Sequence, residues 1–320
     1  MSGAVQVVNP MVLKKIKEKK MKKLIVLIAA MVLVAGYASA AEWSFYGSAR
    51  IATFIDDVDG APDTVFSEGL QGNSRFGFKS KVSDELSGAI EVGNSSSTWN
   101  TRIVWGEWNF GGGSFGVGQH YSPLNLFYSN QVYGGDQDML NYGGVYSGRA
   151  PMLRLKFGSF AIAAVKPAAG NIDMPTIEAS YSLKFDKANV QIAGAYDAGP
   201  DTGDASYVVA VGASLNLGPV SLGGDVYMGD NAEQLIWTTG AGEDNLGYLI
   251  VLGFKANDMV SFEAGYGNAE GDVAGATVDN YSYYAQAVIT LAPGVYVIPE
   301  IGAVNSGNTD YYGAKWQINF

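Results

Sequence analysis

The sequence of 320 residues contains no cysteine and only one histidine, His120. Without cysteine the protein has neither disulfide bonds nor thiolate chemistry. A single histidine excludes a histidine-based metal cluster, and no nucleophile-elbow motif accompanies it to indicate a Ser-His-Asp arrangement. We therefore predict no catalytic residue, no metal site and no cofactor, and we do not expect an enzyme.

Basic residues are also scarce in most of the chain. Residues 1–40 hold seven of the 20 lysines and arginines but only one of the 31 acidic residues. Residues 41–320 therefore carry 13 basic and 30 acidic side chains, a formal net charge of −17. Because nucleic-acid binding depends on clustered lysine and arginine, this balance excludes nucleic acid as a partner.

The only long apolar run lies near the N-terminus, at residues 24–34. Met21 opens the segment MKKLIVLIAAMVLVAGYASA, in which two lysines precede the run and Ala38, Ser39 and Ala40 follow it. This order is typical of a secretory signal peptide, and the run is short for a membrane helix of about 20 residues. We predict that 1–40 are an N-terminal extension and a cleaved signal peptide, with Met21 as the true start. Residues 41–320 are the exported domain.

The exported domain has a hydrophobic pattern with a period of two. In TIEASYSLKF (176–185) every odd-numbered residue is apolar and every even-numbered residue is polar. SFEAGY (261–266) and YYAQAVITL (283–291) alternate in a similar way. Alternation of this kind predicts β-strands that turn one face to an apolar environment and the other to water.

Seven very short turns alternate with eight longer polar loops, among them 55–71, 122–147 and 269–277. These fifteen connections join sixteen predicted strands. We place the strands at residues 43–54, 72–83, 86–94, 101–110, 114–121, 148–157, 159–166, 175–185, 188–197, 205–217, 220–228, 245–256, 259–268, 278–291, 294–304 and 310–320.

Two all-β architectures accept such strands, a soluble sandwich and a transmembrane barrel. Short turns on one side only, an even strand count and strands of about 9–11 residues favour a sixteen-stranded antiparallel barrel with an apolar outer face. A barrel has no sheet edge, so the last strand must pair with the first. The ending GAKWQINF (313–320) fits this, because Trp316, Ile318 and Phe320 alternate with three polar residues.

Eight of the 13 basic residues after position 40 lie between residues 41 and 156. If Phe76 and Phe78 face lipid, Arg75 and Lys79 face the lumen, and the same alternation places Arg154 there. A lysine or arginine on the lipid face at mid-depth costs about 2–4 kcal/mol. The lumen is therefore the expected location of these charges.

Four motifs, taken in order, resemble the Gram-negative general porins: FYGSARIATF (45–54), NSRFGFKSKVSDELSGAIEVG (73–93), TRIVWGEWNFGGGSFGVGQHYSP (101–123) and YGGD (133–136). The resemblance covers essentially all of 41–320. It implies a trimer of sixteen-stranded barrels in the outer membrane, each with its third loop (122–147) folded into the lumen as a constriction. It also implies that the terminal strand, with Trp316, Ile318 and Phe320, is recognised by the barrel assembly machinery.

In the porins an arginine ladder faces acidic groups on the constriction loop. Motif match carries this role to Arg75, Arg102 and Arg149, and position on the same strand face carries it to Arg50. With Lys79 and Arg154 these residues form the predicted basic cluster, opposite Asp136 and Asp138. The chain departs from the family just before the Gly-Gly-Asp, where Gln131, Val132 and Tyr133 stand in place of acidic residues. We therefore expect weak ion selectivity.

The predicted function is passive diffusion of small hydrophilic solutes and ions across the bacterial outer membrane. The expected partners are outer-membrane lipid, lipopolysaccharide and two further copies of the chain. A substrate-specific channel for sugars or an anion remains the alternative. The tyrosine-rich segment NLFYSNQVY (125–133) favours it.

Overall fold

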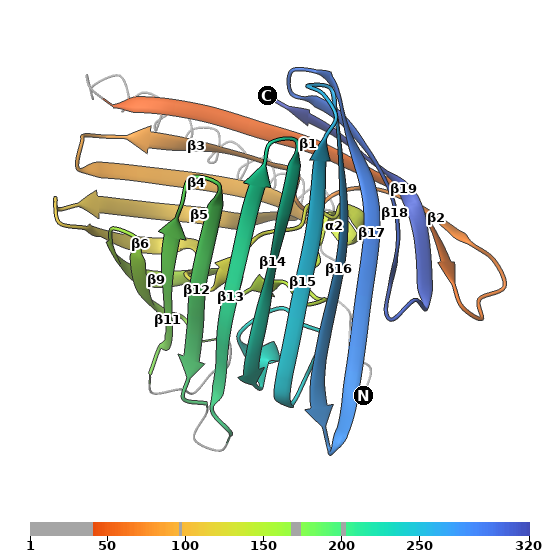
Figure 1. The fold of residues 1–320 in the computed structure, drawn as a ribbon. Helices are drawn as coiled ribbons and strands as arrows, with labels where there is room; N and C mark the ends of the chain where they lie inside the picture. Colours follow the sequence, from red (N-terminus) through yellow and green to blue (C-terminus); the bar gives the residue numbers. More distant parts are fainter. Residues whose placement is uncertain (1–40, 96–97, 168–173, 200–202) are drawn as a thin grey trace, which may run out of the picture.

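The computed structural model describes residues 41–95, 98–167, 174–199 and 203–320. The predicted extension and signal peptide, 1–40, lie outside these residues. The described chain is almost entirely antiparallel β-structure, with only the short helices α2 (Tyr133–Asp136) and η1 (Ala232–Gln234) (Figure 1). No helix within the described ranges is long and apolar enough to cross a membrane.

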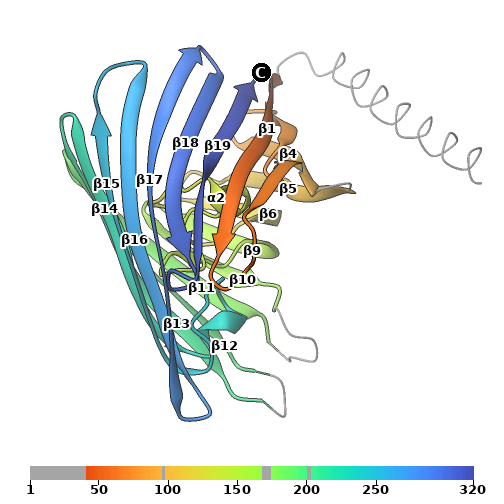
Figure 2. The ribbon, with the colours of Figure 1, turned by 90° about the vertical axis from the view of Figure 1, so that its right-hand side faces the viewer.

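The strands form a closed wall with sixteen positions, as predicted. β1 (Glu42–Val58) pairs with β19 (Thr309–Asn319), and this pairing closes the sheet into a barrel (Figures 1 and 2). Closure pairs the first strand of the wall with the last, as a membrane-spanning sheet requires. The other wall strands are β3 (Arg75–Lys81), β4 (Leu86–Ser95), β5 (Thr98–Asn109), β6 (Ser114–Tyr121), β9 (Arg149–Phe157), β10 (Phe160–Val165), β11 (Thr176–Lys184), β12 (Ala188–Asp197), β13 (Ser206–Leu217), β14 (Val220–Asp230), β15 (Glu243–Lys255), β16 (Val260–Val273), β17 (Ala276–Ala292) and β18 (Val295–Val304).

The predicted loop 55–71 is wrong in part, because it contains a strand. β1 continues to Val58, and β2 (Val65–Leu70) folds back along it from Asp56 to Ile51. β3 then takes the same edge of β1, so β2 and β3 share one position in the wall. The sequence VFSEGL of β2 lacks period-two alternation and all six residues are exposed, so no apolar face marked it as a strand.

The predicted loop 269–277 is also wrong, since most of it is β-structure. β16 and β17 extend to a two-residue turn at Ala274 and Gly275. Both turn residues have positive φ, 53° and 80°, as a type I′ hairpin turn requires. In the extended end of β16, Glu270 and Asp272 alternate with Ala269, Gly271 and Val273. The apolar face is therefore made mostly of small residues and is a weak strand signal.

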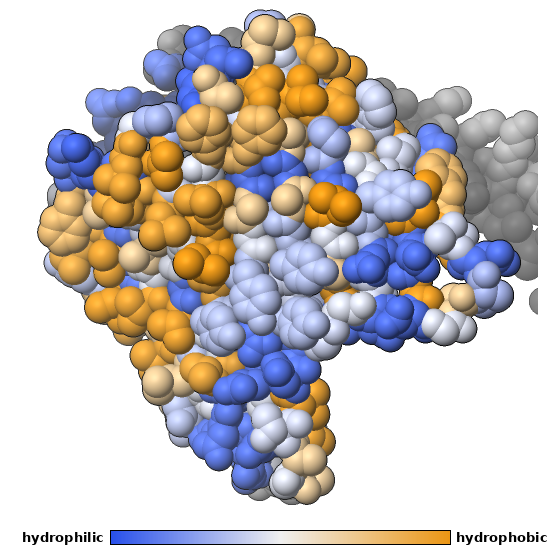
Figure 3. Space-filling model, turned by 45° about the vertical axis from the view of Figure 1, so that its right-hand side comes forward, coloured by the Kyte–Doolittle hydropathy of each residue, from blue (hydrophilic) through white to orange (hydrophobic). Residues whose placement is uncertain are grey.

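Alternate side chains of the wall form an apolar outer surface. On β13, Val209 and Val211 are exposed, whereas Val208 and Ala210 are buried on the opposite face. Figure 3 shows the exposed apolar side chains gathered in broad areas of the outer surface. Further large apolar residues are exposed on strands around the wall: Phe76, Leu153, Ile192, Val226, Ile250, Phe262 and Ile301.

The terminal strand has the predicted alternation. Trp316, Ile318 and Phe320 are exposed, whereas Lys315 is 7% exposed. The backbone N–H of Phe320 donates to the carbonyl of Gly47 at 3.0 Å, and the N–H of Gly47 donates back at 2.6 Å. These two bonds fix the last residue of the chain to the first strand. Recognition by the assembly machinery stays a prediction.

Residues 122–147 connect β6 to β9 and include β7 (Asn125–Leu126), α2 and β8 (Val145–Tyr146). Leu124, Leu126 and Val145 are buried in one cluster with apolar side chains of β12, β13 and β14. Val132 and Met139 are buried in a second cluster with side chains of β1, β15, β17, β18 and β19. This segment therefore covers the apolar side chains that these strands turn away from the outer surface.

Candidate functional site

A cavity of about 1300 Å³ lies between residues 122–147 and the wall. Strand pairing places Arg50 and Arg75 on the same face of the wall. Ser48 of β1 lies opposite Arg75 of β3, and Arg50, two residues after Ser48, turns its side chain to the same face as Ser48. Acidic and amide residues of β16 and β17, such as Glu263 and Gln286, line another part. The cavity brings together six predicted site residues: Arg50, Arg75, Arg102, Arg149, Asp136 and Asp138.

A β-bulge positions Arg102. The pairing of β4 with β5 shifts register between Glu91 and Val92, so that Ile103 lies opposite Glu91 and Thr101 lies opposite Val92. Arg102 is the extra residue, and a bulge of this kind re-aims a side chain. Both Arg102 and Ile103 are buried, at 2% and 7% exposure, although they are neighbours in the strand.

Sequence reasoning missed Glu91, which lies between two of the arginines. Its carboxylate accepts a bond from Nε of Arg102 at 2.5 Å and lies 3.6 Å from Nε of Arg75. The hydroxyl of Tyr46 donates to the same carboxylate at 2.9 Å. The segment AIEVG contained the signal, because Ile90 and Val92 alternate with Glu91 and leave it on the luminal face.

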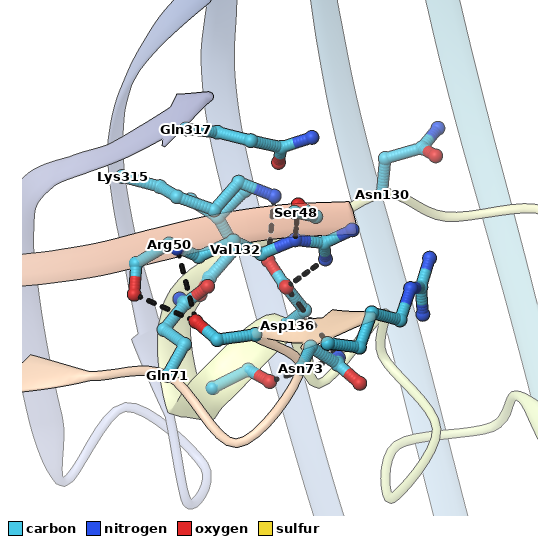
Figure 4. A network of polar contacts seen from close by, with 12 residues as sticks. Ser48, Arg50, Gln71, Asn73, Asn130, Val132, Asp136, Lys315 and Gln317 are labelled. Carbon is cyan, nitrogen blue, oxygen red and sulfur yellow. Dashed lines mark hydrogen bonds and ion pairs between the residues drawn. The ribbon is translucent and has the colours of Figure 1, made fainter. Parts of the chain in front are cut away.

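Asp136 joins the segment 122–147 to both closing strands of the barrel. Its carboxylate is 2.5 Å from a guanidinium nitrogen of Arg50 on β1 and 2.6 Å from Nζ of Lys315 on β19 (Figure 4). Asp136 has a left-handed backbone with φ of 62°, following Gly134 and Gly135 at 66° and 85°. Such a run favours glycine, which explains the Gly-Gly that precedes the aspartate.

Three wall carboxylates hold the same segment through its backbone. Glu178 on β11 accepts from the N–H of Leu124 at 2.9 Å. Glu263 on β16 accepts from the N–H of Asn130 at 2.8 Å. Glu300 on β18 accepts from the N–H of Val132 at 2.7 Å and of Tyr133 at 3.0 Å. These acidic side chains are therefore committed to positioning residues 124–133.

Asp138 differs from Asp136, because no basic side chain among the described residues lies within 4.0 Å of its carboxylate. Burial of the group and the neighbouring negative charge of Asp136 raise the pKa of Asp138 well above its usual range. Lys315 and Arg50 act in the opposite direction, but their effect is smaller. Asp138 therefore gives up its proton less readily than an ordinary aspartate does.

Arg149 also differs from the other three arginines of the cavity. Its guanidinium donates to the hydroxyl of Tyr121 at 2.9 Å and lies 5.1 Å from the centre of the Tyr121 ring. Within the described ranges, no carboxylate lies within 4.0 Å of it. Arg149 is thus a cation on the cavity wall whose charge is not neutralised by an ion pair.

Lys79 and Arg154 lie apart from these four arginines. Neither lines the main cavity. Arg154 pairs with Glu107 at 2.9 Å and lies over the ring of Trp105 at 4.6 Å. Lys79 lines a separate cavity together with Glu107. Among the described residues, no cluster of three or more histidine or acidic side chains is arranged to hold a metal ion.

A family profile described as Gram-negative porin matches residues 27–309. The chain belongs to this family. It is therefore a porin, an outer-membrane diffusion channel, and the cavity lies within its barrel. No curated protein matches the sequence significantly.

Solved structures of outer-membrane proteins share the fold of this porin. The outer membrane channel DcaP of Acinetobacter baumannii is 15% identical with a TM-score of 0.72, covering 88% of this chain and 98% of its own. Salmonella typhi OmpF, solved in complex with daunomycin, is also 15% identical with a TM-score of 0.72, covering 89% and 99%. The trimer form of Vibrio cholerae OmpT is 15% identical with a TM-score of 0.61, covering 88% and 100%.

Proposed function

We propose that this porin is a general, passive channel without catalytic activity, which lets small hydrophilic solutes pass down their gradients. Residues 122–147 fold into the lumen and form its constriction. The observation that carries this proposal is the set of contacts from Asp136 to Arg50 and Lys315 and from residues 124–133 to Glu178, Glu263 and Glu300. A segment held from so many strands is a fixed obstruction, so flux is limited by size and charge.

The charges of the constriction support weak ion selectivity. Asp136 neutralises part of the charge of Arg50 and Lys315, and Glu91 does the same for Arg75 and Arg102. Rings of charge at the narrowest point set the selectivity of a channel. Pairing leaves a modest positive excess there, whereas the net charge of −17 over residues 41–320 attracts cations to the mouth.

We also propose that the porin is a homotrimer in contact with lipid and lipopolysaccharide, and that residues 1–40 contain a cleaved signal peptide beginning at Met21. The apolar outer surface supports lipid contact. The trimer is supported by the solved trimer form of Vibrio cholerae OmpT, which has the same fold.

Swelling of proteoliposomes tests the proposed function. Vesicles with the folded protein are diluted into isosmotic solutions of neutral sugars of increasing size, and light scattering follows solute entry. We expect rates that fall steeply with solute size and no swelling in protein-free vesicles. Swelling with a single sugar only would favour the substrate-specific channel, and absence of swelling with correctly folded protein would contradict a diffusion channel.

A further inference from the structure

Four aromatic rings form a connected group beside Arg149. Tyr121 of β6 lies 5.5 Å from Phe127 and 6.4 Å from Tyr146, measured between ring centres. Phe127 lies 5.7 Å from Tyr146, which lies 4.8 Å from Trp237. The rings come from a wall strand, from residues 122–147 and from the segment after η1. All four, and Arg149, line the same cavity of about 1300 Å³.

Two of these rings present large apolar surfaces to the cavity. Phe127 is 49% exposed and Trp237 is 54% exposed. Their positions are fixed, because Trp237 packs edge-on against Tyr146 and its backbone N–H donates to the carbonyl of Tyr146 at 2.9 Å. Exposed apolar surface that borders a water-filled cavity rather than lipid marks a place where a ligand is bound.

The charge beside the rings selects an anion. Arg75, Arg102 and Arg149 carry three positive charges, and Glu91 is the carboxylate that pairs with the first two. Arg149 is held by Tyr121, whose hydroxyl accepts a bond from its guanidinium at 2.9 Å. The remaining N–H groups of an arginine can donate to a carboxylate.

We infer that Arg149, Phe127 and Trp237 form a binding subsite for small aromatic carboxylates, with the ring against the aromatic side chains and the carboxylate on the guanidinium. This inference rests on the proposed function, since the subsite lies on the path of a diffusing solute. The ligand slows in the channel and its flux saturates, whereas neutral solutes of the same size pass without binding.

Partial block of single-channel current tests the subsite. Benzoate is compared with cyclohexanecarboxylate, which has the same charge but no aromatic face, and with benzyl alcohol, which has the ring but no charge. We expect benzoate to reach half-block at a concentration about three- to tenfold below that of cyclohexanecarboxylate, the factor typical of one aromatic contact. Benzyl alcohol should not block at these concentrations.

Three variants locate the effect. Trp237→Leu and Phe127→Leu should each raise the half-blocking concentration of benzoate about three- to tenfold and leave that of cyclohexanecarboxylate nearly unchanged. Arg149→Gln should raise the value for both acids by about tenfold or more, as expected for loss of a charged hydrogen bond. Lys187→Gln, at the exposed turn between β11 and β12, is the matched control for loss of a positive charge and should change neither.

Calorimetric titration of benzoate into the folded protein in detergent separates this inference from the proposed function. A protein that binds benzoate but does not conduct would contradict the channel and support the subsite. A conducting protein that binds benzoate no better than cyclohexanecarboxylate, or whose binding survives Arg149→Gln, would overturn the subsite. Block by neutral sugars in place of benzoate would overturn it as well.

Discussion

Arg102 and Arg149 line the same cavity, yet their surroundings differ. The guanidinium of Arg102 is 3% exposed and bonded to Glu91, with a further bond to Asn73 at 2.8 Å. The guanidinium of Arg149 contacts the hydroxyl and the ring of Tyr121. The charge of Arg102 is therefore used to fix the wall, whereas that of Arg149 is available to solutes. The number of arginines alone therefore overestimates the positive electric field in this channel. Whether an arginine forms an ion pair with a carboxylate determines how much it contributes.

The largest effect is expected from removing the partner of Arg102. Glu91→Gln leaves a buried guanidinium without its counter-charge, and breaking a buried pair in this way costs about 3–5 kcal/mol. The free energy of unfolding, measured by urea titration in lipid vesicles, should fall by this amount. Asp84→Asn is the control, because its pair with Lys81 is exposed and the loss of an exposed pair should leave the free energy of unfolding nearly unchanged. Equal losses in the two variants would contradict the distinction between buried and accessible pairs.

Asp136→Asn tests the pairs between the wall and residues 122–147. Hydrogen bonds to charged groups contribute about 1.5–3 kcal/mol each, and this variant weakens one to Arg50 and one to Lys315. We expect residues 122–147 to become sensitive to added protease and the channel to favour anions more than the wild type does. Asp186→Asn, at the exposed turn between β11 and β12 and outside the lining of the cavity, should change neither property. An unchanged preference for ions would show that Arg50 and Lys315 do not contribute to the field.

Arg149→Gln should shift ion preference toward cations, because it removes a cation of the cavity wall that has no paired carboxylate among the described residues. A unit charge 4 Å from an ion contributes about 1 kcal/mol in water, or roughly a fivefold change in local concentration. The cation-to-anion permeability ratio of Arg149→Gln, taken from the reversal potential, should therefore rise by a factor of about 2–5. Arg102→Gln also removes one positive charge, but it leaves Glu91 paired with Arg75 alone. We therefore expect this variant to lose stability as well, whereas Arg149→Gln should not. An unaltered ratio in Arg149→Gln would refute its role as the accessible cation.

The smallest effect concerns pH. Burial and Asp136 raise the pKa of Asp138, so the folded protein holds this proton more tightly than the unfolded chain does. The resulting stabilisation is present below the ordinary pKa of aspartate and is lost as pH rises through the higher, folded pKa. Hydrogen exchange of residues 131–144 should therefore speed up as pH increases, beyond the intrinsic effect of base. In Asp138→Asn the exchange rate should rise with pH only by the intrinsic effect of base. A larger rise in this variant would show that another group titrates.

The sequence predicted the wall well, because period-two alternation is a direct consequence of a surface with lipid on one side and water on the other. It failed where that contrast is missing. β2 has no apolar face, and at the tips of β16 and β17 one face is acidic while the other has only small residues and scattered valines, such as Val273 and Val278. β13, with the run YVVAV (207–211), was predicted within one residue at its start, although its inner face is apolar because Leu124 and Leu126 cover it.

The site was predicted in outline from motif match and strand face. Arg50, Arg75, Arg102, Arg149 and Asp136 do lie around one cavity. The ion pairs of these residues could not be predicted from the sequence, because they join residues that are far apart in the chain. The bond from Lys315 to Asp136 spans 179 positions, and the bulge that turns Arg102 toward Glu91 has no sequence signature.

We propose an open, water-filled channel whose electric field is weakened by ion pairs within the barrel. Planar-bilayer recording of the purified, folded protein under a tenfold salt gradient tests it most directly. We expect large ohmic current steps with a reversal potential close to zero. Absence of steps from folded protein, or a reversal potential near the limit for a purely cation- or anion-selective pore, would contradict it.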